Sequence, residues 1–357
     1  MRRILRVVLG FGLALLAVGG FLWFVGPASV LRELSRAEPA VLAVGFLAVV
    51  GAFYCWSEAL RRLLVSIGCD VRGPRYRAAF MSGEFLKQIV PMGHSGGPVF
   101  VSYAVSRETD APYEEALAAA TVVEFVNIGA SVALAAAGLG VLLATGTATD
   151  GPVFVALVTG LAIAVAFLLS VAVLVYYRRA LVERFVLWLA AGGRATVGRA
   201  SARAHSALAA DRVRATFETY YVAFDRALAD RWQVWRAAAF SLVGWALFLL
   251  PMYTSFHAID QPVPYALVIL VVPVLSLVNI VPLPGGLGGF EVALAGVVVA
   301  LVGIGLPAAT AGVFLYRLSN YWFVVMLGGL ASLAVSVRLA DPPSPLGPTD
   351  GEPAEAE

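Results

Sequence analysis

The chain has 357 residues, of which 60% are hydrophobic and 13% are charged, and its mean hydropathy is +0.86. This apolar surface exceeds what one soluble core can bury, so we expect lipid to be the solvent for most of the chain. The formal net charge of +2 is too small to favour nucleic-acid binding. The two cysteines, Cys55 and Cys69, fit neither a metal-ligand spacing nor a disulfide framework, and no metal or cofactor is expected.

Six apolar runs are long enough to cross a bilayer as helices. They cover residues 4–25, 40–64, 116–144, 152–177, 237–258 and 308–337. Three arginines open the first run as in a signal peptide, but the run is about 20 residues long and no clear small-residue cleavage site follows it. We therefore expect an uncleaved first helix and an all-α polytopic membrane protein.

Two further apolar runs, residues 78–104 and 264–306, are interrupted by prolines, glycines and polar residues, so neither predicts an ordinary spanning helix. Arginines are frequent at 61–77, just before the interrupted run 78–104. They are also frequent over 178–236, which contains eleven arginines and five acidic residues. Short loops rich in arginine lie on the cytoplasmic side. Both termini are then cytoplasmic, in the plasma membrane, if the two interrupted runs are re-entrant hairpins from opposite faces.

The two interrupted runs resemble each other when they are aligned on Pro91 and Pro282, each preceded by Ile-Val. A pair of glycines follows each proline, and Glu124 lies 27 residues after Gly97 while Arg317 lies 28 residues after Gly289. A repeat with three crossings is inverted relative to its copy, as in many secondary transporters. The alternative is that two glycine-rich loops align by chance.

The repeat predicts three parts of the chain. Residues 1–145 form the first membrane repeat, with two helices, hairpin 78–104 and a third helix. Residues 146–338 form the second repeat, which includes the basic cytoplasmic loop 178–236 and hairpin 264–306. Residues 339–357 are an acidic tail that is too polar to pack and is expected to be disordered.

Five charges far from the ends of the apolar runs are candidate substrate-binding groups, because charges in a membrane are costly and are usually paired, water-facing or functional. They are Glu84, Lys87, Glu124, Glu291 and Arg317. The spacing of Glu84 and Lys87 predicts a local pair, which could equally serve to stabilise the hairpin. The matched positions of Glu124 and Arg317 suggest that they meet near the pseudo-twofold axis, or that Arg317 is left to hold a phosphate.

The two glycine-rich stretches can present backbone N–H groups to an anionic group at a helix start. The alternative is that the glycines only allow tight turns. Amide and hydroxyl side chains near the same level could also contact a substrate, although such groups more often join helices. The candidates are His94, Ser95, Gly96, Gly97, Gly285, Gly286, Gly288, Gly289, Asn127, Asn279, Asn320 and Tyr321.

Three motifs carry a family resemblance: Ser82-Gly-Glu84-Phe-Leu-Lys87, the stretch Pro-x-x-Gly-Gly-x-Gly-Gly-Phe-Glu291, and Tyr316-Arg317 followed by Tyr321-Trp322. They resemble the membrane region of lysylphosphatidylglycerol synthases and the related stand-alone flippase-like proteins, over about residues 1–338. The resemblance implies flipping of a phospholipid or a polyprenyl-phosphate-type lipid. Because only a short acidic tail follows Arg338, aminoacyl transfer is not expected.

The leading functional hypothesis is therefore a lipid translocator without enzymatic activity, whose partners are membrane lipids. One alternative is an intramembrane serine hydrolase using Ser95, which lies in a Gly-x-Ser-x-Gly pattern, with His94 or His257 as its base. A second alternative is a non-transporting membrane partner of a lipid or glycosyl transferase, with loop 178–236 as the docking surface. The sequence indicates no oligomeric state.

Overall fold

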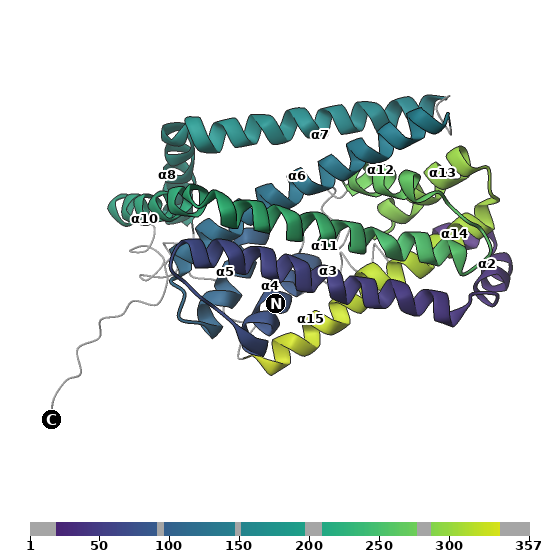
Figure 1. Cartoon of the computed structure of the whole chain (residues 1–357), viewed down its shortest axis with the longest axis horizontal. Coiled ribbons are helices and arrows are strands. Elements are labelled where there is room, and N and C mark those ends of the chain that lie inside the picture. The colour runs from purple at the N-terminus through teal and green to yellow at the C-terminus, as the bar shows by residue number, and fades with distance from the viewer. Residues whose placement is uncertain (1–18, 91–95, 147–150, 197–208, 277–286, 336–357) are drawn as a thin grey trace.

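The computed structural model describes residues 19–90, 96–146, 151–196, 209–276 and 287–335, and these ranges form a bundle of α-helices without strands (Figure 1). Five helical segments are long and apolar enough to cross a membrane. They are α3 (Pro39–Ser66), α6 (Tyr113–Thr145), α7 (Pro152–Tyr177), α11 (Arg231–His257) and the stretch Leu306–Ala334. The expected all-α polytopic architecture is confirmed, and most of the expected first helix, 4–25, lies outside the described residues.

The ends of these helices follow local sequence signals. A proline lies in the first turn of α3 and α7, where the missing N–H costs nothing. Asp230 caps α11 by accepting a hydrogen bond from the backbone nitrogen of Gln233 at 3.2 Å. α6 ends at Gly146, whose φ of +65° is the left-handed conformation that glycine adopts most readily.

Each interrupted run is divided into two shorter helices, as the sequence predicts. The first gives α4 (Gly73–Ile89) and α5 (Gly97–Glu108), and the second gives α12 (Tyr265–Leu275) and α13 (Gly289–Val302). The two helix pairs lie toward opposite ends of the bundle (Figure 1). Residues 91–95 and 277–286, between the arms, lie outside the described residues, so re-entry from opposite membrane faces stays a prediction.

The two largest hydrophobic clusters among the described residues lie one beside each helix pair. The first includes Leu60 of α3, Phe80 of α4 and Ala119 of α6. The second includes Val268 of α12, Leu294 of α13 and residues of α14 (Leu306–Arg317). Since α6 and α11 contribute to both clusters, and α3 packs along α11, the two ends are joined into one body.

The packing between the two predicted repeats is reciprocal. α4 packs against α15 (Phe323–Ala334), and α12 packs against α6, so an arm of each helix pair contacts the third helix of the other repeat. A glycine lies at each of these contacts. A Cβ on Gly328 of α15 would lie 2.6 Å from Phe85 Cβ, and one on Gly138 of α6 would lie 2.6 Å from the oxygen of Ala266. Small residues allow such close helix contacts in membranes. The inverted repeat itself stays a prediction.

α7 packs only lightly against the bundle. Only 6% of its most apolar window is buried in the protein. Large apolar side chains along its length, including Val155, Ile163 and Phe167, are exposed. Such a surface is compatible with lipid and not with water, so α7 is a lipid-facing element of the bundle.

The first prediction concerns the glycine contact between α4 and α15. Gly328→Ala should destabilise the protein by about 1–3 kcal/mol, because the added methyl would clash with Phe85 Cβ and the oxygen of Met81. Thermal unfolding followed by circular dichroism in detergent measures the effect. Gly329→Ala is the matched control, since its Cβ would lie 3.8 Å from Phe85 Cε2, an ordinary contact. Equal melting temperatures for the two variants would contradict the close contact.

Candidate functional site

The first charged cluster, which we call the Lys87 centre, consists of Lys87, Glu84 and Glu124. Lys87 Nζ lies 3.1 Å from Glu84 Oε1 and 3.7 Å from Glu124 Oε2. The side chains of Lys87 and Glu84 are 11% exposed, and that of Glu124 is 32% exposed. The pair predicted from the spacing of Glu84 and Lys87 is therefore formed, and it extends from α4 to α6.

Glycines make room for the Lys87 centre. A Cβ on Gly97 would lie 2.9 Å from Lys87 Cε, and one on Gly83 would lie 2.6 Å from Val101 Cα. The first contact lets the lysine side chain pass the start of α5, and the second brings α4 and α5 together. Gly96, the N-cap of α5, also faces a side chain, because its Cβ would lie 3.1 Å from Phe100. Gly96 and Gly97 therefore allow close packing, which is the alternative to anion binding that the sequence left open.

The second charged cluster, the Arg317 centre, joins α13 to α14. Arg317 Nε donates to Glu291 Oε1 at 2.6 Å, and both side chains are buried. The other carboxylate oxygen of Glu291 accepts a hydrogen bond from the backbone nitrogen of Gly288 at 2.6 Å. The Arg317 guanidinium also lies 4.5 Å from the ring centre of Tyr321 and 5.3 Å from that of Phe290. Charge, hydrogen bonds and ring faces thus hold Arg317 at the start of α13.

The expected meeting of Glu124 with Arg317 was wrong. Glu124 pairs with Lys87, and Arg317 pairs with Glu291. The physical reason is that residues at equivalent positions of two repeats have equivalent surroundings. This equivalence does not bring the two residues into contact with each other. In each predicted repeat, the charged residue on the third helix pairs with an oppositely charged residue from the helix pair of the same repeat. The third helix carries the negative charge in the first repeat and the positive charge in the second.

A five-residue π-helix, η5 (Leu318–Trp322), follows Arg317 directly. Asn320 and Tyr321 lie on it with exposed fractions of 7% and 2%, and within the described part of the chain Asn320 Oδ1 and Tyr321 Oη have no hydrogen-bond partner. Leaving such an atom unpaired costs about 1–3 kcal/mol, and π-helical turns are frequent at functional sites. These two atoms are therefore available to a bound polar group.

Asn127 repeats this feature in the first half of the chain. It follows Glu124 by three residues, as Asn320 follows Arg317 by three. Its Oδ1 atom is also buried and unpartnered among the described residues. Both third helices therefore carry a charged residue of an ion pair and, one turn later, an amide oxygen without a hydrogen bond.

The remaining candidates are placed only in part. His94, Ser95, Asn279, Gly285 and Gly286 lie outside the described residues. Gly288 has a φ of +90°, which suits a glycine at the turn into α13. A Cβ on Gly289 would meet nothing within 4 Å. His257 ends α11, with Nδ1 2.9 Å from the oxygen of Tyr253 and its ring centre 3.9 Å from that of Tyr253. The Ser95 hydrolase hypothesis stays a prediction.

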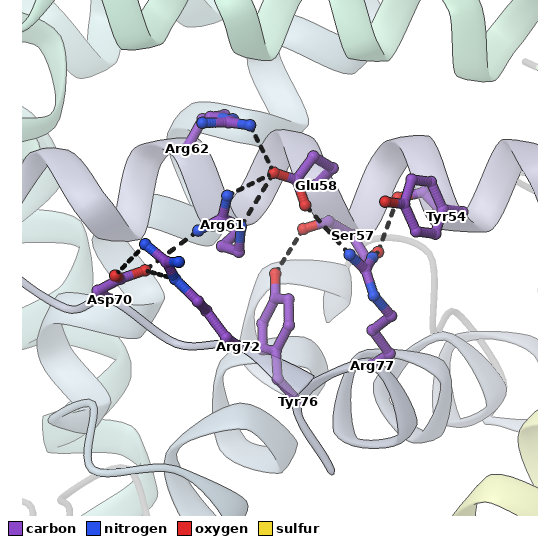
Figure 2. A network of polar contacts seen from close by, with 9 residues as sticks. All are labelled: Tyr54, Ser57, Glu58, Arg61, Arg62, Asp70, Arg72, Tyr76 and Arg77. Carbon is purple, nitrogen blue, oxygen red and sulfur yellow. Dashed lines mark hydrogen bonds and ion pairs between the residues drawn. The ribbon is translucent and has the colours of Figure 1, made fainter. Parts of the chain in front are cut away.

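Sequence reasoning missed a third charged cluster, the Glu58 network, which Figure 2 shows between α3 and α4. Glu58 is buried near the end of α3 and pairs with Arg61 at 2.8 Å, with Arg62 at 2.8 Å and with Arg77 of α4 at 3.2 Å. The spacing of Glu58 from Arg61 and Arg62 was a usable signal, because residues three and four apart share a helix face. The arginines had been interpreted only as markers of membrane orientation.

Further contacts bind the start of α4 to the same part of α3. Tyr76 Oη donates to the oxygen of Ser57 at 2.6 Å, and Arg77 donates to Ser57 Oγ at 2.6 Å (Figure 2). Asp70, in the turn between the helices, pairs with Arg72 at 2.6 Å and with Arg61 at 3.1 Å. The hydrogen bond from Arg72 holds the pKa of Asp70 below its usual range. The Glu58 network thus fixes the direction in which α4 leaves α3.

The second prediction tests this network. Glu58→Gln should destabilise the protein by about 3 kcal/mol, because it removes the charge that holds three guanidinium groups together. Thermal unfolding in detergent measures the loss. Glu33→Gln, in a surface pair with Arg36 at 3.3 Å, is the control and should change little. A Glu58→Gln variant as stable as the control would show that the network does not hold α4.

The third prediction concerns Cys69, whose Sγ donates to Glu115 Oε2 at 3.1 Å. Burial, aided by Glu115, raises the pKa of the Cys69 thiol to about 12. Only the thiolate is nucleophilic, and a raised pKa removes it at neutral pH. Alkylation by iodoacetamide at pH 8 should therefore be at least about 100-fold slower than that of glutathione. Comparable rates would show that the thiol is neither buried nor held by Glu115.

The structure defines an all-α polytopic membrane protein whose broken helices are joined to spanning helices by buried ion pairs. Residues 4–328 match the family described as the lysylphosphatidylglycerol synthase TM region, and the chain belongs to that family. Two curated relatives are both called UPF0104 membrane protein, from Methanothermobacter thermautotrophicus. One is 24% identical over 322 residues, 87% of this chain and 88% of that protein. The other is 32% identical over 104 residues, 28% of this chain and 30% of that protein.

Proposed function

We propose that this protein is a lipid flippase that moves an anionic phospholipid or a polyprenyl-phosphate-type lipid across the plasma membrane, without catalysing a reaction. One observation carries the proposal. Two ion centres, one buried and one partly buried, lie at corresponding places in the two predicted repeats, and each joins a broken-helix pair to a third helix. Charges held inside an apolar bundle are typical of substrate and ion pathways. The transmembrane family of the chain supports the same function.

The geometry of the ion centres favours exchange of partners. Lys87 lies between two carboxylates at 3.1 and 3.7 Å, so a small movement of its side chain exchanges one for the other. A lipid phosphate offers the same acceptor geometry as a carboxylate, and arginine binds either one. The phosphate would displace Glu291 from Arg317 and accept a hydrogen bond from Tyr321 Oη. Asn320 Oδ1 would accept a hydrogen bond from a head-group hydroxyl in a lipid that has one, while the acyl chains stay in lipid.

Orientation and partners belong to the same proposal. The arginine-rich end, with the Glu58 network and α8 (Arg179–Thr196), would face the cytoplasm, as would both termini. Membrane lipids are the partners that translocation requires. Among the described residues, no contact favours the hydrolase or the transferase-partner hypothesis over translocation.

The fourth prediction tests transport in vesicles that contain fluorescent phosphatidylglycerol or a fluorescent polyprenyl phosphate. Lys87→Ala and Arg317→Ala should each slow the flipping rate at least about tenfold, because a hydrogen bond to a charged group contributes about 1.5–3 kcal/mol. Arg36→Gln removes an exposed guanidinium and should flip at the wild-type rate. If the wild-type protein flips neither lipid, the proposal fails.

Tyr321→Phe separates a role in transport from a role in folding. The variant removes only Oη, which has no partner among the described residues, so the melting temperature should stay the same or rise. Flipping should slow about fivefold, the value of one hydrogen bond of about 1 kcal/mol. A variant that flips at the wild-type rate would show that the head group does not bind Tyr321.

A further inference from the structure

α8 carries an apolar face that no other described part of the protein covers. Leu181, Phe185, Trp188 and Leu189 are 48%, 57%, 68% and 50% exposed. Residues at this spacing share one face of a helix. The rings of Phe185 and Trp188 are stacked, with centres 6.0 Å apart, so the face is a continuous apolar strip.

The opposite face of α8 is bound to α10 (Ala210–Ala229). Arg179 pairs with Asp225 at 2.6 Å, and Glu183 pairs with Arg214 at 3.5 Å. Ala190, on the same face, is buried. With about 100° of rotation per residue, these positions lie roughly half a turn from Phe185. The apolar strip therefore cannot turn toward the protein without breaking both ion pairs.

The position of α8 indicates what covers the strip. α7 ends at Tyr177, and α8 begins at Arg179, standing across the end of α7 (Figure 1). Tyr176 and Tyr177 are exposed and lie at the end of the lipid-facing helix α7. Aromatic residues are enriched at the boundary between hydrocarbon and head groups. An apolar strip that starts at Leu181, four residues after Tyr177, lies at the depth of that boundary.

The charge around the strip adds a preference. Arg178, at the bend, and Arg184, beside the strip, are both exposed. Basic residues beside an apolar helix face attract anionic lipids. A second copy of the chain or a soluble protein would leave unexplained why the strip continues from a lipid-facing helix.

We propose that α8 is an interfacial helix whose strip of Leu181, Phe185, Trp188 and Leu189 inserts into the leaflet at which α7 ends, with a preference for anionic lipid. The helix anchors more than itself, because α10 is bound to α8 and packs against α6, which carries Glu124.

The fifth prediction measures insertion with an environment-sensitive fluorophore attached at Phe185→Cys in the full chain. In vesicles of phosphatidylethanolamine and phosphatidylglycerol, emission should shift to the blue and be quenched by lipids with a nitroxide near the head group. The same label at Asp211→Cys is the control, because Asp211 is 98% exposed and its label should be quenched by aqueous iodide. Unmodified protein, labelled in parallel, reports any signal from Cys55 and Cys69.

Two results would overturn insertion: iodide quenching at position 185 equal to that at 211, or a label shielded from both iodide and lipid nitroxide, which would indicate a protein partner. The lipid preference has its own comparison. Arg184→Gln should lower the ratio of inserted to water-exposed label about fivefold in anionic vesicles, whereas Arg212→Gln should not. An unchanged ratio, or an equal ratio in phosphatidylcholine vesicles, would overturn the anionic preference.

Discussion

A charge inside an apolar bundle needs a partner of opposite charge, and the arrangement of this protein depends on that constraint. Lys87 joins α4 to α6, Arg317 joins α13 to α14, and Glu58 joins α3 to α4. Removal of one member of such a set leaves an uncompensated buried charge, which costs about 3–5 kcal/mol. The ion pairs therefore fix the positions of the broken helices relative to their neighbouring helices.

The charges of the two centres also restrict how an anionic head group can bind. With all groups ionised, the Lys87 centre has one cation and two carboxylates, and the Arg317 centre has one of each. Among the described residues, neither centre has more cations than carboxylates. A phosphate must therefore replace a carboxylate as the partner of a cation. Replacement keeps the cation paired but leaves the displaced carboxylate without a cation, so that carboxylate must take up a proton or move toward water.

The features that the sequence predicted are those that depend on neighbours along the chain. The broken runs follow from prolines and glycines, and the Glu84–Lys87 pair follows from a spacing of three residues. Arg317 and Glu291 are 26 residues apart on different helices, so only packing brings them together. The π-helix after Arg317 was not predictable either, because its sequence, Leu-Ser-Asn-Tyr-Trp, has no helix-breaking residue.

The π-helix η5 lies where the third helix of the second repeat exchanges one neighbour for another. Before it, α14 packs against α13 of its own repeat, and after it, α15 packs against α4 of the other repeat. α6 likewise contacts both α5 and α12. Movement of either helix pair must therefore displace the third helix of its own repeat and that of the other repeat. Asn320 and Tyr321, which have free hydrogen-bonding atoms among the described residues, lie at this junction. A head group bound there would contact the segment through which the two repeats constrain each other.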